Sequence, residues 1–293
     1  MDIQWYPGHM TKTIRQMQED IKLVDLVIEV LDARIPVSSR NPDIDALAAG
    51  KARLLVLNKA DLADERENTR WVRYFKEQGI TAVLTDARNR GSVKNLMPAI
   101  TEACKEKTAR DRAKGMKERP IRTMIAGIPN VGKSTFINSF SGKAMTKTGN
   151  KPGVTRGKQW IRLGGRVELL DTPGLLWPKF EDKTVGENLA LIGSINDQIL
   201  DEGGLALVLI RRLREGYPGK LALRYKIEEE GTDLSCMEEI GRKRGCLRKG
   251  GEIDYGRAAS ILLDEYRSGV LGRISLETAP DKVITIEKDP QGS

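Results

Sequence analysis

The sequence predicts an α/β fold, a mostly parallel sheet with helices on both faces, followed by a smaller and mainly α-helical domain. Two observations predict it. Over the first 178 residues, apolar β-branched runs alternate with polar helical stretches, a pattern typical of βαβ units. After Pro178 strand signals become rare and helix-compatible segments dominate. We therefore expect one domain at residues 1–178 and a second at residues 179–293, with a loosely held tail after Pro280.

The individual elements follow from the same patterns in chain order. Residues 11–21 have helical periodicity, and strands are expected at residues 26–31, 53–57, 82–85, 122–126 and 166–170. Helices are expected at residues 64–78, 93–107, 133–140, 188–200, 206–214, 237–244 and 255–266. Asp254 is expected to cap the last helix and Gly269 to end it.

Length and composition exclude several classes of protein. The 293 residues, 39% of them hydrophobic, suffice for about two domains that each bury a core. No apolar run approaches the roughly 20 residues that cross a membrane, and the first residues lack the pattern of a signal peptide. Cys104, Cys236 and Cys246 are widely spaced and predict reduced thiols. We expect a cytoplasmic protein with no membrane span.

The net charge of +8 is unevenly distributed. Residues 1–178 hold 31 Lys+Arg against 20 Asp+Glu, while residues 105–166 alone hold 16 basic and 3 acidic residues. A single basic run would suit a solvated surface equally well. A segment more positive than the whole protein favours contact with nucleic acid.

A second basic run follows an acidic one near the C-terminus. Residues 228–239 contain six acidic residues and no basic one, and residues 242–249 contain five basic residues and no acidic one. The candidates for phosphate contacts are Arg242, Lys243, Arg244, Arg248 and Lys249; the alternative is a solvated helix end. With only 5% aromatic residues, backbone recognition of folded RNA is favoured over base stacking.

Residues 127–134 match the phosphate-binding pattern G-x-x-x-x-G-K-S. They follow an expected strand and precede an expected helix, which is the context the pattern requires. Lys133 would reach the β- and γ-phosphates, and the Ser134 hydroxyl would hold Mg²⁺. Backbone N–H groups of such a loop surround phosphates, so the candidate nucleotide-binding residues here are Asn130, Val131, Gly132, Lys133, Ser134 and Thr135.

Residues 58–61 match N-K-x-D after an expected strand. The Asp61 carboxylate would accept hydrogen bonds from the N1–H and amino group of guanine, which adenine does not offer. Asn58 would reach the other edge of the base, and the Lys59 stem would cover the ring. The tetrapeptide is weak evidence alone and strong evidence beside residues 127–134, so together they predict binding of GTP and GDP.

Residues 171–174 match D-x-x-G, in which Asp171 would hold Mg²⁺ through water and the Gly174 N–H would meet the γ-phosphate. Thr155 is the best candidate for the switch threonine that completes the Mg²⁺ ligands, and Thr148 is a poorer alternative.

Asp86 and Ala87 lie where a guanine-binding loop is expected, although the match is loose and only the Ala87 N–H is expected to act. The motifs occur in the order N-K-x-D, this loop, the phosphate loop, Thr155 and D-x-x-G, whereas a typical small GTPase begins with the phosphate loop. Each follows an expected strand, so a parallel sheet would bring them to one edge. The order predicts a circularly permuted P-loop GTPase domain.

Five further segments extend this pattern to a known family: Trp5–Met10, Asp32–Pro36, Ser39–Pro42, Asp171–Lys179 and Arg244–Leu247. With the permuted motifs, they resemble the bacterial ribosome biogenesis GTPase A (YlqF/RbgA) family. The resemblance implies a cytoplasmic GTPase that binds the large (50S) ribosomal subunit precursor, its 23S-type rRNA and ribosomal proteins. It also implies a helical RNA-contacting C-terminal domain, hydrolysis accelerated by the particle and release afterwards. We expect a monomer in solution.

Catalysis is the least determined part of the site. Many GTPases place Gln after the D-x-x-G glycine to orient the attacking water. Here Leu175 occupies that position, and an aliphatic side chain cannot orient water. Slow intrinsic turnover is therefore expected. His9 is the only histidine, and the residues alone leave structural, rRNA-contacting and catalytic roles open. The resemblance implies that His9 activates water, and that Asn130 helps to hold K⁺ beside the phosphates. The catalytic candidates are His9, Lys133, Thr155 and Gly174.

Two other functions fit the nucleotide motifs. One is a regulatory GTPase switch that recruits a protein effector without RNA contact, and the other is a metabolic or tRNA-modifying P-loop enzyme. The basic segment at residues 105–166 argues against the first, and the absence of an added catalytic module argues against the second.

Overall fold

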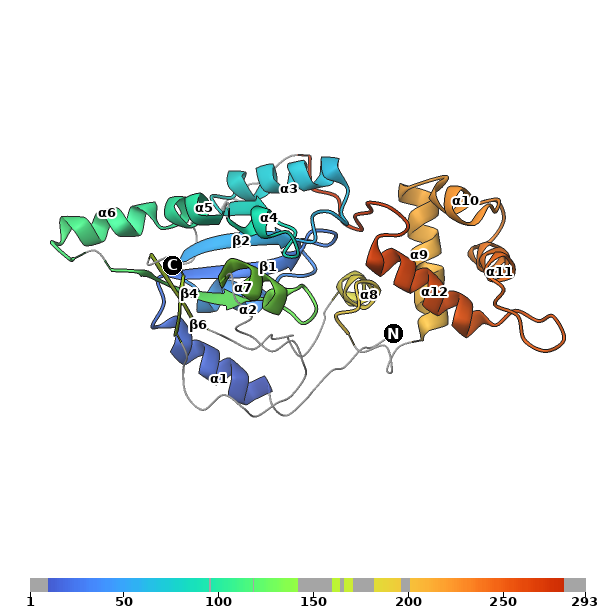
Figure 1. The fold of residues 1–293 in the computed structure, drawn as a ribbon, viewed down its shortest axis with the longest axis horizontal. Coiled ribbons are helices and arrows are strands. Elements are labelled where there is room, and N and C mark those ends of the chain that lie inside the picture. Colours follow the sequence, from blue (N-terminus) through green and yellow to red (C-terminus); the bar gives the residue numbers. More distant parts are fainter. Residues whose placement is uncertain are drawn as a thin grey trace, which may run out of the picture.

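A six-stranded sheet forms the centre of the first part of the chain (Figure 1). This computed structural model describes residues 10–94, 96–117, 119–141, 160–163, 166–170, 182–195 and 201–281. The strand order is β3-β2-β1-β4-β6-β5. The strands are β1 (Leu26–Asp32), β2 (Ala52–Asn58), β3 (Thr81–Leu84), β4 (Ile121–Ala126), β5 (Trp160–Leu163) and β6 (Val167–Leu170). All except β5 run parallel, and the five predicted strands are confirmed to within one residue at each end.

Both faces of the sheet are covered by helices, as predicted. Alternate strand residues such as Val27 and Leu57 face one side, where the cover is α1 (Met10–Ile21), α2 (Pro42–Leu47) and α3 (Glu65–Glu77). Residues of the other parity, such as Ile28 and Val56, face α4 (Arg90–Lys94), α5 (Leu96–Ala103) and α7 (Lys133–Ser141). Strands buried on both faces read as nearly continuous apolar runs, interrupted within β1 only by the buried Glu29 before the end at Asp32, which explains why β1 and β2 were predictable.

The helix expected at residues 93–107 is wrong as a single element. The chain forms α4, α5 and then α6 (Lys105–Ala113) instead. The described interruption is at Cys104, where α5 has ended at Ala103 and α6 has not yet begun; Asn95, between α4 and α5, lies outside the described residues. The antiparallel edge strand β5 was also not expected.

Helices are the main elements of the described chain beyond β6, which confirms the mainly α-helical second part. They are α8 (Lys183–Leu191), α9 (Glu202–Gly216), α10 (Lys220–Tyr225), α11 (Asp233–Lys243) and α12 (Tyr255–Ser268). The Asp254 carboxylate accepts a hydrogen bond from the Arg257 N–H at 3.2 Å, and Gly269 ends α12 with a φ of 81°, both as predicted. The helix expected at residues 188–200 ends already at Leu191 because Gly193 takes a left-handed φ of 75°.

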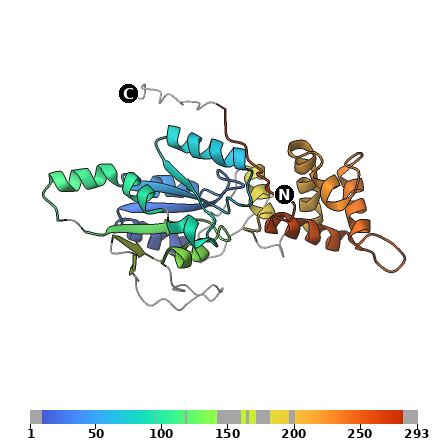
Figure 2. The ribbon, with the colours of Figure 1, turned by 45° about the horizontal axis from the view of Figure 1, so that its top comes forward.

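The chain returns to the sheet after α12 (Figure 2). The Ile274 N–H donates to the Leu62 carbonyl at 2.9 Å, and the Glu277 carboxylate accepts the N–H groups of Val37 and Ser38 at 2.7 and 2.9 Å. The expected domain boundary at Pro178 lies outside the described residues, so that division stays a prediction.

Two expectations drawn from composition concern the state of the cysteines and membrane-spanning helices. Cys104, Cys236 and Cys246 are buried and free. Among the described residues, no helix has the length and apolar character needed to span a membrane.

Candidate functional site

The candidate site lies where the parallel strands end. β1 ends at Asp32, directly beside Asn58 at the end of β2, and β4 ends at Ala126 in front of the phosphate loop. Because the carboxyl ends of parallel strands meet at one edge, the loops that follow them converge. The permuted order of the motifs therefore leaves their arrangement in space intact.

Asn58 joins three of these loops through one buried side chain. Its Nδ2 donates to the Val131 carbonyl at 2.7 Å, in the phosphate loop. Its Oδ1 accepts the Ala87 N–H at 2.9 Å and the Thr85 hydroxyl at 3.3 Å. The Ala87 N–H thus donates to Asn58 in this structure, and its expected contact with guanine stays a prediction.

Lys59 also connects the N-K-x-D loop to the phosphate loop. It has a φ of 58°, a left-handed conformation that non-glycine residues rarely adopt, and its Nζ donates to the Asn130 carbonyl at 2.7 Å. The ammonium also lies 3.1 Å from Asp32 Oδ2, and Asp32 is bonded by the buried Arg34 guanidinium at 2.9 and 2.8 Å. Burial alone would raise the pKa of Asp32, but Arg34 and Lys59 outweigh it and hold that pKa well below its usual value.

Asp61 has one carboxylate oxygen without a partner. Its Oδ1 is buried and accepts no hydrogen bond from the described residues, while Oδ2 forms an ion pair with Arg88. Arg88 also donates to Asp86 Oδ1 at 3.0 Å; burial tends to raise the pKa of Asp86, but these hydrogen bonds lower it overall. A buried acceptor without a donor is costly, and the N–H groups of a guanine would satisfy it.

The phosphate loop requires its two glycines. Gly127 and Gly132 have φ values of 150° and 94°, which L side chains rarely adopt. A Cβ at Gly127 would lie 2.5 Å from the Val30 carbonyl oxygen, and one at Gly132 would lie 2.5 Å from Asn58 Nδ2. The loop is therefore shaped against β1 and against the side chain of the N-K-x-D asparagine.

Lys133 opens α7 and donates from Nζ to the Ile128 carbonyl at 2.5 Å. Burial disfavours the charged ammonium and lowers the pKa of Lys133 to about 8. A phosphate beside it would reverse this effect because opposite charge favours the protonated form. Ser134 and Thr135 are exposed in the same first turn of the helix, where an anion would be stabilised.

The turn after α8 contacts the phosphate loop through two hydrogen bonds. Asn130 has a φ of 62° and donates from Nδ2 to the Gly193 carbonyl at 2.6 Å. The Ser194 hydroxyl donates to the Pro129 carbonyl at 2.9 Å. Within the described residues Asn130 Oδ1 accepts no hydrogen bond, and this oxygen fits the expected role as a ligand of a monovalent cation.

Arg267 of α12 reaches the end of α8 from the helical region. It donates to the carbonyls of Ala190 and Leu191 at 2.9 and 3.0 Å, and its own carbonyl lies 3.5 Å from an Arg34 nitrogen. This arginine was not among the predicted site residues. No local signal could have revealed it, since its partners are 76 and 77 residues away.

The remaining predicted site residues lie outside the described residues: His9, Thr148, Thr155, Asp171 and Gly174. Of the expected Mg²⁺ ligands only Ser134 is described. Among the described residues no group of three His, Cys, Asp or Glu side chains could hold a metal ion. The magnesium site thus stays a prediction.

The basic residues expected to contact RNA in the helical region are all exposed. Arg242 pairs with Glu238 at 3.3 Å, Arg248 lies 3.6 Å from Asp254, and Arg244 pairs with Glu265. Lys243 and Lys249 have no carboxylate partner in the described chain.

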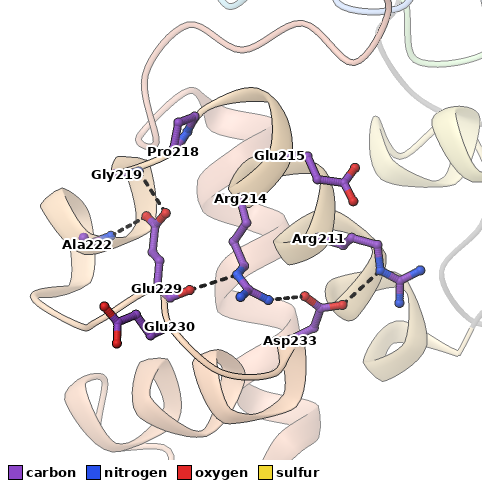
Figure 3. A pocket seen from close by; sticks show the side chains of 9 residues that line it. All are labelled: Arg211, Arg214, Glu215, Pro218, Gly219, Ala222, Glu229, Glu230 and Asp233. Carbon is purple, nitrogen blue, oxygen red and sulfur yellow. Dashed lines mark hydrogen bonds and ion pairs between the residues drawn. The ribbon is translucent and has the colours of Figure 1, made fainter.

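A hollow of about 640 Å³ between α9, α10 and α11 is a less suitable ligand site (Figure 3). Arg211 and Arg214 donate to Asp233 at 3.0 and 2.7 Å, and Glu229 accepts the N–H groups of Gly219 and Ala222 at 2.8 and 2.9 Å. These charges are satisfied by one another and by the backbone, so they hold the three helices together.

Comparison with known proteins extends over nearly the whole chain. Residues 122–217 match a family model described as 50S ribosome-binding GTPase. The chain is 48% identical to ribosome biogenesis GTPase A of Bacillus cereus over 95% of its own length and 94% of that protein. GDP-bound YlqF superposes with a TM-score of 0.66 at 29% identity, covering 90% of this chain and 99% of that one. GNP-bound YlqF from T. maritima gives a TM-score of 0.64 at 30% identity, covering 92% and 100%.

Proposed function

The chain belongs to the ribosome biogenesis GTPase A family, and from this premise we propose that it is a GTP-hydrolysing assembly factor of the large ribosomal subunit. It binds the 50S precursor through its 23S-type rRNA and neighbouring ribosomal proteins, acts as a cytoplasmic monomer, and leaves after hydrolysis. The observation that carries this proposal is the 48% identity over 95% of the chain, which includes the helical region as well as the nucleotide loops.

The proposed base contact is Asp61 with guanine. Its unpartnered Oδ1 would accept guanine N–H groups, Asn58 and Ala87 would shape the other edge, and Asp86 would hold Arg88 in place. Val131, Gly132, Lys133, Ser134 and Thr135 would surround the phosphates, since the residues that open α7 present N–H groups and a positive helix end.

Two cations complete the proposed site. Ser134, Thr155 and Asp171 would hold Mg²⁺, and Asn130 would contribute its Oδ1 to K⁺. When bound, the two ions neutralise charge that develops on the phosphates. The orientation of the Asn130 amide supports this assignment, because Nδ2 is used by the Gly193 carbonyl and only the oxygen remains.

The proposed hydrolysis needs a group other than Leu175 to orient water, and we assign this role to His9. Thr155 and Gly174 would respond to the γ-phosphate, so that GTP orders both switches and hydrolysis releases them. Binding to the ribosomal particle would bring His9 into place, which accounts for the slow turnover expected of the free protein.

One experiment tests the function directly. GTP turnover is measured with and without purified large subunits, at two concentrations of KCl. We expect stimulation by the particle that weakens as salt rises, because phosphate contacts release counterions. A regulatory switch with a protein effector would show neither the stimulation nor salt-sensitive binding, and that result would overturn the proposal.

A further inference from the structure

The helix α6 is unusual in having no buried residue. Six Lys or Arg and two Asp or Glu occur in residues 105–117, so the helix and the turn after it are strongly basic. A nine-residue helix is marginal in water by itself, and a helix that is polar all round needs another reason to be present. Some of its charges form ion pairs with the sheet domain, and others have no carboxylate partner among the described residues.

One part of α6 is bound to the sheet domain. Lys107 Nζ lies 3.1 Å from Asp25 Oδ1 and donates to Asp111 at 2.5 Å. Arg119, just beyond the helix, contacts both oxygens of Asp25 at 2.7 and 2.8 Å. Burial tends to raise the pKa of Asp25, but these hydrogen bonds lower it overall. Lys107 and Arg119 therefore have a structural role.

Three other basic side chains have no such role. Arg110, Lys114 and Lys117 are exposed, and within the described chain none has a carboxylate within 4.0 Å. Arg110 and Lys114 line a hollow of about 490 Å³ between α6 and the start of β2, together with Lys51 and Lys107 and with the acidic residues Asp25, Glu106 and Asp111. Asp25 and Asp111 pair with Lys107, which leaves the charges of Arg110 and Lys114 available to an anion.

The position of α6 separates it from both sites already described. Figures 1 and 2 show it extending past the sheet, at the end of the molecule opposite α9–α12. The nucleotide loops lie at the other edge of the sheet, where β1, β2 and β4 end. A partner on α6 would touch neither the nucleotide nor the basic residues of the helical region.

We propose that Arg110, Lys114 and Lys117 of α6 and its following turn bind the phosphate backbone of folded rRNA, as a contact separate from the helical region. This inference rests on the proposed function. Charge favours RNA over a protein partner, because Met116 is the only exposed large hydrophobic residue between Lys105 and Lys117 and no aromatic anchor is present. Lysine and arginine point contacts on phosphates position a protein without reading sequence.

The test is a full-length variant carrying R110Q, K114Q and K117Q. Its affinity for purified large subunits and for their deproteinised rRNA is measured over a range of KCl concentrations. Each lost phosphate contact lowers the slope of log affinity against log salt by about 0.9, so we expect a decrease of about 2 to 3 for both ligands. The loss of affinity relative to wild type should shrink by roughly 40-fold between about 50 and about 200 mM KCl. GDP affinity should be unchanged.

A matched control removes three positive charges from α3, with R66Q, R73Q and K76Q, all exposed. Its salt slope should equal that of the wild type. If the α6 variant also keeps the wild-type slope, the inference is overturned while the proposed function stands. A loss seen with the particle but not with bare rRNA would identify an acidic protein surface instead and would overturn it too. If the wild type shows no salt-sensitive binding, the proposed function itself fails.

Discussion

The Asn58 amide donates a hydrogen bond to the Val131 carbonyl at 2.7 Å, so one buried side chain joins the N-K-x-D loop to the phosphate loop across 73 residues. The same side chain accepts the Ala87 N–H. Base recognition and phosphate binding are therefore built on a shared contact. A substitution in either loop is therefore expected to alter the structure of the other loop and its binding of nucleotide.

Gly132→Ala tests this shared contact. The new Cβ would lie 2.5 Å from Asn58 Nδ2 on a residue with a φ of 94°, so the asparagine must move and the backbone is strained. Such strain costs roughly 1–3 kcal/mol, and we expect the Kd for GDP to rise at least about fivefold. Titration with a fluorescent GDP analogue measures it. Gly50→Ala is the control, since Gly50 has a φ of 77° but no atom within 4 Å of an added Cβ. An unchanged Kd in G132A would contradict the prediction.

Asp61→Asn is expected to move base preference from GTP towards XTP. The buried Oδ1 has no donor among the described residues, and a carboxylate is the acceptor that guanine requires there. A hydrogen bond to a charged group contributes about 1.5–3 kcal/mol, which corresponds to a change of roughly 10- to 150-fold in relative affinity. Competition of GTP, XTP and ATP for the site measures it. If D61N keeps the wild-type order of affinities, Asp61 does not read the base.

The loops of the site were predictable from sequence because each motif is a short local pattern and the parallel sheet brings the loops together. Asn58 and Lys133 each follow an apolar strand, and a parallel sheet places such positions at one edge whatever their order in the chain. The interruption at Cys104 between α5 and α6 and the turn at Gly193 after α8 are local features that the periodic pattern conceals, and the short edge strand β5 was not predicted either. Arg267 was out of reach for another reason. Its contacts depend on how α12 lies against the end of α8, which no short segment encodes.

Lys133 is expected to make nucleotide binding dependent on pH. Burial lowers the pKa of its ammonium to about 8 in the absence of phosphate, so the side chain is charged at neutral pH and loses its proton as the pH rises through that value. Phosphate requires the charged form. Above pH about 8 each bound GDP should therefore take up nearly one proton, and its affinity should fall by up to about tenfold per pH unit.

Calorimetry in two buffers of different ionisation enthalpy measures that proton uptake. The matched control is Lys133→Arg, because a guanidinium stays charged throughout the range and should take up no proton. Equal proton uptake by the wild type and K133R above pH about 8 would rule out Lys133 as the source.

Asn130→Gly is expected to abolish the difference between KCl and NaCl in particle-stimulated GTP hydrolysis. Glycine tolerates the φ of 62°, so the substitution removes the amide without straining the loop. The Ser194→Ala variant is the control, since it removes the neighbouring hydrogen bond to Pro129 and keeps the amide. Potassium stimulation that persists in N130G, or that is already absent in the wild type, would show that this side chain holds no activating cation.

Arg267→Gln is expected to weaken the coupling between nucleotide and the helical region. Arg267 holds the carbonyl end of α8, and the next turn of the chain holds the phosphate loop through Gly193 and Ser194. Without it, α12 loses its connection to the nucleotide loop through the end of α8. The preference of the large subunit for the GTP-bound over the GDP-bound protein should then fall at least about fivefold, within the usual range of coupling energies.

Nucleotide affinity of the free R267Q variant should stay within about threefold of wild type, because the residue touches no predicted nucleotide contact. Arg257→Gln, at the start of the same helix, is the control and should leave the preference intact. Coupling between two sites is reciprocal, so large subunits should also raise the GTP affinity of the wild type more than that of R267Q. If large subunits raise the GTP affinity of the wild type and of R267Q equally, the coupling between the two sites does not pass through Arg267.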